Sequence, residues 1–164
     1  MPAPSLQVDL SFTPAADFGA LGPRFQLVFG ERVEREAIPP QPAEEVFGLA
    51  VHHAVRARLC IERGRLWQAE YWISAMRDHA LELACLQRGL ESAHGRGFDQ
   101  LPAELLNAVT PALVGAIDRD ELLHSLACAL RTLLAQASEN RDLAPLANRL
   151  EPQLKELLEP VLVG

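Results

Sequence analysis

The residues best suited to chemistry lie in one stretch, RLWQAEYWISAMRDH, which spans residues 65–79. Several of its polar side chains are three or four residues apart, and that spacing places them on one face of a helix. A helix here would present two carboxylates, a hydroxyl and a guanidinium beside two aromatic rings. The candidates are Glu70 as general base or acceptor-orienting group, and Trp67, Tyr71, Ser74, Arg77 and Asp78 as substrate-binding groups.

This polar face has two interpretations. A carboxylate beside aromatic rings suits a cationic or hydroxylated ligand, and a partly desolvated acid can orient a hydroxyl or take its proton. Alternatively, the face is solvated and Arg77 simply pairs with Glu70 or Asp78. The spacing fits the wall of a cleft and a solvated surface equally.

Metal-binding patterns are present only in fragments. Two Glu-x-x-His sequences, at 91–94 and 121–124, resemble the inward-facing pairs of di-iron helical bundles. The first lies among glycines, and the second begins with Glu121, which is placed to cap a helix. His52 and His53 have no ligand-type residue four positions on, so we assign them to packing and surface. No metal site is expected.

Signatures of nucleophilic catalysis and phosphate binding are missing from the sequence. It contains no GxSxG elbow, no Walker loop and no GxGxxG turn. The loop AHGRGFDQLP, residues 93–102, places His94 and Arg96 between glycines, where the backbone could approach a ligand. The same composition is typical of a loop that only joins two helices.

Composition predicts one globular chain that does not bind nucleic acid. The chain has 164 residues, 49% of them hydrophobic and 23% charged, with a net charge of −7. No block of Lys or Arg offers the clustered charge that phosphate backbones need. Three separated cysteines without a CxxC spacing suit a reducing compartment. With no basic leader and no apolar run of the ~20 residues that spans a bilayer, we expect a cytoplasmic location without membrane contact.

The first 41 residues predict a strand pair and a linker. In LQVDLSF, residues 6–12, apolar and polar side chains alternate strictly, as in a strand with one buried face. FQLVF, residues 25–29, is a second short strand candidate. The charged and proline-rich run ERVEREAIPPQP that follows is typical of a connector.

Residues 42–164 predict an antiparallel four-helix-type bundle. A short helix should open at Pro102, and Asp118 with Glu121 has the spelling of a capping box. Pro152 should kink or split the last helix. Short links between amphipathic helices favour antiparallel packing, so the fold class is mostly α with a short N-terminal strand element. Apolar side chains recur at helical spacing over about 42–63, 66–88, 119–138 and 142–161.

The runs WQAEYWISAMRDHALELACLQRGL and HGRGFDQLP resemble the helical C-terminal domain of small bacterial nucleotidyltransferases, relatives of kanamycin nucleotidyltransferase. The likeness covers roughly residues 6–105. In that family a mixed-sheet domain holds nucleotide and metal through a Gly-Ser motif, an Asp-x-Asp pair and a third carboxylate. The helical domain supplies the wall that binds the acceptor. The resemblance therefore implies that the polar face at 70–78 points toward an acceptor.

The catalytic motifs of that family are incomplete in this chain. Asp9, on the polar side of the first strand candidate, resembles the third carboxylate, but no Gly-Ser dipeptide occurs. The Asp-x-Asp sequence at 118–120 lies at the start of a predicted helix, so it cannot be the metal-binding pair. Two-metal phosphoryl transfer needs several converging carboxylates. We therefore expect a non-catalytic substrate-binding domain, with Mg²⁺ and a nucleoside triphosphate held only together with a catalytic partner. On this interpretation residues 1–41 are a remnant of the catalytic domain, and the chain is either a truncated piece of a longer enzyme or works with a separate catalytic chain.

The expected partner is a separate nucleotidyltransferase catalytic chain or a second copy of this chain, and a small-molecule acceptor is a candidate ligand. Two alternatives stay open. A related bundle forms ribonucleases and toxins of the HEPN class, which use an Arg followed by a His. Arg88 and His94 match that spacing, although Gly89 stands where a polar residue is usual. The other alternative is a structural bundle that only mediates association.

Overall fold

The computed structural model describes residues 8–22, 25–36 and 39–158. The chain divides into two compact units, residues 1–40 and residues 41–164. Five α-helices and several short 3₁₀ turns make up the regular structure of the described residues, and none of these residues forms a strand. The mostly α fold expected from the sequence is confirmed.

The described part of the N-terminal unit is irregular chain around one 3₁₀ turn, η1 (Ala15–Asp17). The amide of Val33 donates to the carbonyl oxygen of Phe18 at 2.8 Å, and Arg35 donates to the carbonyl oxygen of Asp17 at 3.0 Å. Gly19 permits this approach, because a Cβ there would lie 2.4 Å from the carbonyl oxygen of Val33. These contacts join two segments of the unit without a strand ladder.

The expected strand pair is not observed in the described part of this unit. Residues 8–12 and 25–28 have no regular structure, and a bend follows at residue 29; residues 6 and 7 lie outside the described ranges. Leu10 and Phe12 are 82% and 96% exposed. An alternating pattern forms a strand only when another strand takes up its hydrogen bonds and covers its apolar face. Neither condition is met in the residues described.

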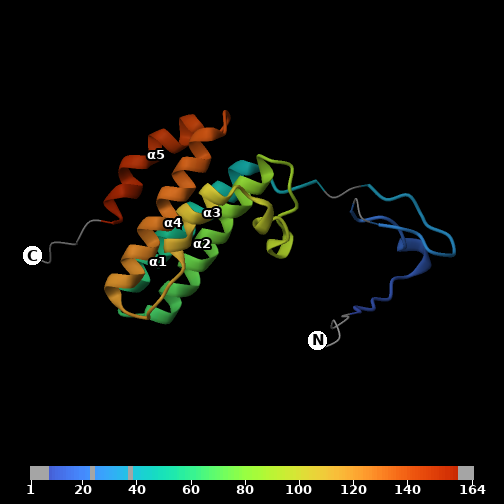
Figure 1. Ribbon diagram of the computed structural model, residues 1–164, viewed down its shortest axis with the longest axis horizontal. Coiled ribbons are helices and arrows are strands. Elements are labelled where there is room, and N and C mark those ends of the chain that lie inside the picture. Colours follow the sequence, from blue (N-terminus) through green and yellow to red (C-terminus); the bar gives the residue numbers. More distant parts are fainter. Residues whose placement is uncertain (1–7, 23–24, 37–38, 159–164) are drawn as a thin grey trace, which may run out of the picture. The chain divides into compact units, whose positions relative to one another are not determined.

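Helices α1 (Ala43–Glu62) and α2 (Leu66–Leu86) form an antiparallel hairpin, since only three residues join them and they pack along their length (Figure 1). Pro42 precedes α1, where its missing N–H costs no hydrogen bond. Gly64, with φ +67°, ends α1 in the left-handed conformation that glycine adopts most easily. The amide of Arg65 then donates to the carbonyl oxygen of Cys60 at 2.9 Å.

Helix α4 (Arg119–Glu139) begins at the expected cap. The side chain of Asp118 accepts from the amide of Glu121 at 3.0 Å. Only half of the predicted capping box forms, because the Glu121 carboxylate accepts from the amide of Gly115 at 2.9 Å. Glu121 therefore fixes the loop before the helix.

The remaining elements are short turns, α3 and α5. Helix α3 opens after Pro102, as expected, and α5 contains Pro152 within its span. Their bounds are η2 (Ala93–Gly95), η3 (Phe98–Gln100), α3 (Ala103–Val109), η4 (Thr110–Ala112) and α5 (Ala144–Glu156).

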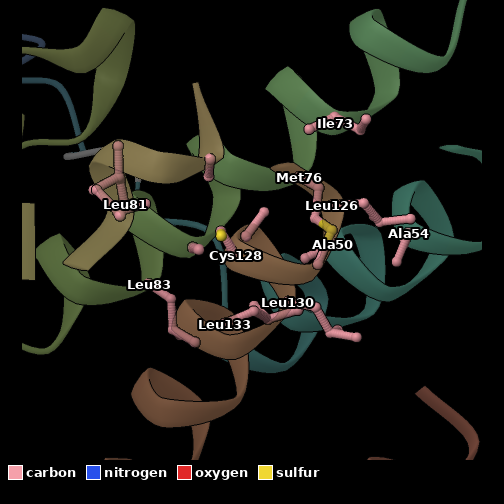
Figure 2. Packing of buried hydrophobic residues seen from close by; sticks show 14 of the residues in the cluster. Ala50, Ala54, Ile73, Met76, Leu81, Leu83, Leu126, Cys128, Leu130 and Leu133 are labelled. Atoms are coloured by element: carbon pink, nitrogen blue, oxygen red, sulfur yellow. The ribbon is translucent and has the colours of Figure 1, made fainter. Parts of the chain in front are cut away.

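The hydrophobic core lies between α1, α2 and α4, which all contact one another, while α3 and α5 pack against α4 (Figures 1 and 2). Small side chains such as Ala50 and Ala54 of α1 face larger ones such as Met76 and Leu126 of the other two helices. Helix α2 therefore buries one face in the core, while side chains such as Trp67 and Tyr71 are exposed to solvent. Among the residues described, no helix is both long and apolar enough to cross a bilayer.

Candidate functional site

The structure brings Glu70, Ser74 and Arg77 together on one flank of α2; with Asp78 they form what we call the polar stripe. The hydroxyl of Ser74 donates to the Glu70 carboxylate at 2.7 Å. The Arg77 guanidinium reaches the Ser74 oxygen at 3.4 Å. Because the residues follow one another by about one helical turn, the helix itself sets these distances. The stripe is a preformed chain from guanidinium to hydroxyl to carboxylate.

Arg77 pairs with Asp78 and not with Glu70. Its Nε and NH2 donate to one oxygen of Asp78 at 3.1 and 2.8 Å. The side chain of Arg77 is 17% exposed and that of Asp78 is 53% exposed. Within the described residues, Glu70 therefore has a hydroxyl as its only hydrogen-bond partner and no cation to neutralise it. Among the described residues, the polar contacts of the stripe lie within α2, so the stripe does not tie one helix to another.

Two aromatic rings border the stripe and are exposed. Trp67 is 77% exposed and Tyr71 is 61% exposed. The rings of Tyr71 and Trp72 form a T-shaped pair with centroids 5.0 Å apart. Exposed aromatic rings therefore lie on the same helix as the Glu70 carboxylate, at the spacing noted in the sequence.

A second cluster, which sequence reasoning assigned only to packing and surface, lies between α1 and α2. The ring of His53 stacks on His79 with centroids 5.1 Å apart and lies 5.0 Å from Trp72. The guanidinium of Arg56 lies 5.0 Å from the Trp72 ring. Nδ1 of His53 and Nε1 of Trp72 are buried without a hydrogen-bond partner in the described structure. Burial first, and then the neighbouring His79 and His52, lower the pKa of His53 below its ordinary value.

The same cluster continues into a polar pocket. Nδ1 of His79 lies 3.0 Å from one oxygen of Glu82, and the Ser92 hydroxyl lies 3.4 Å from the other. The signal in the sequence was the spacing of Trp72 and His79, seven residues apart on one helix face, with Glu82 three residues on. Sequence reasoning did not use that spacing.

Within the helical unit the other candidate residues are not brought together, and Glu91 pairs with Arg96 at 2.6 Å. Asp9 belongs to the N-terminal unit. Arg88 donates to Gln136 of α4 at 3.3 Å, whereas His94 lines a different pocket in the loop after α2. Among the described residues, no group of three or more His, Cys, Asp or Glu side chains could hold a metal ion.

No family model, curated protein or solved structure matches this chain. Function is therefore inferred from the side chains and their surroundings.

Proposed function

We propose that this chain is a non-catalytic, substrate-binding helical domain or subunit of a nucleotidyltransferase. In this proposal α1, α2, α4 and α5 are the four helices of an antiparallel bundle. The polar stripe on α2 forms the wall that receives the acceptor. A separate nucleotidyltransferase catalytic chain would supply Mg²⁺ and the nucleoside triphosphate, and the complex would work in the cytoplasm.

The observation that carries the proposal is the state of Glu70. Its carboxylate is partly buried and accepts a hydrogen bond from Ser74, yet no cation neutralises it in the part of the chain described. Arg77 pairs with Asp78, which the solvated-face interpretation also allows, and this pairing leaves Glu70 with the hydroxyl of Ser74 as its partner. A carboxylate whose position is set by a hydrogen bond from Ser74 can orient the hydroxyl of an acceptor molecule or take its proton.

Exposed apolar surface supports the same proposal. Trp67 and Tyr71 expose ring surface that a ligand or partner chain would cover, and aromatic faces attract cations and sugar-like rings. In the N-terminal unit the apolar side chains Val8, Leu10 and Phe12 are exposed as well. Such a surface is typical of one that a partner buries, and Asp9 between them is our candidate for a carboxylate contributed to a partner's metal site.

The test compares acceptor binding with stability in the full chain. Saturation-transfer NMR with inositol and with glucosamine as probes would measure binding of a neutral polyol and of an amino sugar. The variant Glu70→Gln removes the charge and keeps the shape. Glu156→Gln, at the end of α5, is the matched control, because Glu156 is exposed and lies on another helix.

We expect at least one probe to bind the native chain and the Glu156→Gln variant, and binding to fall about tenfold or more in Glu70→Gln at unchanged melting temperature. Retained binding with a lowered melting temperature would show that the stripe is structural. Failure of both probes to bind would reject an acceptor wall on this helix. Adding a catalytic chain that carries Gly-Ser and Asp-x-Asp motifs should then yield nucleotide transfer that depends on Glu70.

A further inference from the structure

The pocket beside His79 shares Asp78 with the polar stripe, but Glu70, Ser74 and Arg77 do not line it. It has a volume of about 510 Å³, within the usual range of small-molecule sites. Helix α2 forms one wall and the loop after it forms the other. Its lining residues are Asp78, His79, Glu82, Ser92, Ala93, His94, Gly95 and Phe98.

Hydrogen bonding to Glu82 orients the ring of His79. A carboxylate oxygen can only accept, so Nδ1 of His79, 3.0 Å from Glu82, carries the hydrogen. When that is the only hydrogen on the ring nitrogens, Nε2 is a hydrogen-bond acceptor, and it has no partner among the described residues. His53, stacked behind His79, is disfavoured in its charged form by its burial. This wall is thus a flat imidazole ring with a second imidazole stacked on it.

The opposite wall has an unusual backbone conformation. His94 has φ +56°, a left-handed value that is uncommon for a residue with a side chain, and Gly95 follows with φ +73°. Arg96 pairs with Glu91 at 2.6 Å, and Gln100 donates to the carbonyl oxygen of Arg96 at 3.2 Å. Strained backbone that the surrounding contacts maintain is often found at ligand sites.

The charge and shape of the lining select the ligand. Asp78 and Glu82 are acidic, and no Lys or Arg is among the residues that line the pocket. Asp78 uses one carboxylate oxygen for Arg77, and the other has no bond among the residues described. The pocket therefore combines hydrogen-bond acceptors with the flat rings of His79, His94 and Phe98.

We propose that this pocket binds the guanidinium group of a small molecule. A guanidinium is planar and weakly hydrated, so flat rings can cover its faces while its N–H groups point to Asp78 and to Nε2 of His79. An ammonium ion is strongly hydrated and needs acceptors on several sides, which flat rings do not supply. A phosphate or carboxylate would meet Asp78 and Glu82 with like charge. The site does not depend on the nucleotidyltransferase proposal.

The experiment titrates the full chain with methylguanidinium chloride and follows the imidazole signals of His79 and His94 by NMR. Methylammonium chloride and inorganic phosphate are the competing probes at matched ionic strength. Asp78→Asn removes one acceptor charge at a surface ion pair that contributes little to stability. Asp99→Asn is the matched control, because Asp99 is exposed in the same loop and does not line the pocket.

We expect a saturable shift of both imidazoles with methylguanidinium, about tenfold weaker binding of methylammonium, and no shift with phosphate. Asp78→Asn should weaken methylguanidinium binding about tenfold, and Asp99→Asn should leave it unchanged. The proposal would be overturned if methylguanidinium gave no saturable shift, or if methylammonium bound equally well or more tightly. It would also be overturned if phosphate bound, or if both variants lost methylguanidinium binding equally. Melting temperatures of the two variants identify any loss that arises from unfolding.

Discussion

Replacing Gly97 with alanine tests how the loop after α2 is built. Gly97 is buried, and its φ of −94° is open to any residue, so the backbone conformation does not require glycine. Space does. A Cβ at this position would lie 2.4 Å from the carbonyl oxygen of Glu91 and 3.3 Å from the sulfur of Cys85. The carbonyl oxygen belongs to the backbone, so it cannot rotate away as the end of a side chain can.

The expected cost follows from that distance. Real Cβ contacts are almost never below 3.0 Å, so the Glu91 carbonyl must retreat by about 0.6 Å. Forcing an extra carbon into a packed site costs about 1–3 kcal/mol of unfolding free energy. For a chain of this size 1 kcal/mol shifts the melting temperature by about 2–4 °C. Gly97→Ala should therefore melt about 2–12 °C below the native chain.

Gly48→Ala is the matched control, because it makes the same chemical change where nothing opposes it. Gly48 is exposed in α1, and a Cβ there would meet no atom within 4 Å. Alanine favours a helix over glycine by about 1 kcal/mol, so this variant should melt about 2–4 °C higher. Differential scanning calorimetry, with urea titration as a second measurement, compares the two variants under one buffer condition.

The signs of the two changes decide the outcome. If Gly97→Ala melts at or above the native temperature, the loop does not pack against Glu91 and Cys85 as described. If both variants fall together, alanine destabilises for a reason unrelated to contact distance. Opposite signs would support the tight packing of the loop that forms one wall of the pocket beside His79.

Four other outcomes are expected. Asp118→Ala should lower the unfolding free energy by about 1 kcal/mol through loss of the cap, and Asp120→Ala by much less, in urea titrations. Folding lowers the pKa of His53, so below about pH 6.5 the unfolded chain binds a proton at this residue more readily than the folded chain does. The midpoint of urea unfolding should therefore fall as the pH is lowered through this range. His53→Phe should reduce that dependence on pH. The isolated chain should transfer no nucleotide with Mg²⁺ and ATP, and turnover abolished by Asp9→Asn would contradict this. Light scattering at micromolar concentration should show a dimer or complex, and a uniform monomer would contradict that.

The helices could be predicted because their causes are local. The expected segments 42–63, 66–88 and 119–138 match α1, α2 and α4 to within about two residues, since apolar periodicity and the terminating glycines belong to the segments themselves. The last helix is described to Glu156, and residues 159–161 of its expected span lie outside the described ranges. The strand pair was expected from alternation alone, and alternation does not say whether a neighbouring strand exists.

The polar stripe could also be predicted, because helical spacing brings its members together. Its pairing could not, since Arg77 reaches both neighbours and only the structure shows that it binds Asp78. The cluster around His53 was missed for a different reason. Its rings come from two helices, and the register between them is set by core packing, which no single segment encodes. His53 and His79 meet only in the folded hairpin.

The two tryptophans of the chain report on different places without any labelling. Trp67 is exposed beside Glu70, so its fluorescence should be that of an indole in water and should respond to whatever covers the polar stripe. Trp72 is half-buried, with imidazoles and a guanidinium around it, and protonated imidazole quenches an adjacent indole. Replacing either one with phenylalanine would leave a single emitter. An acceptor or a partner chain should then change the emission from position 67, while acid should dim the emission from position 72.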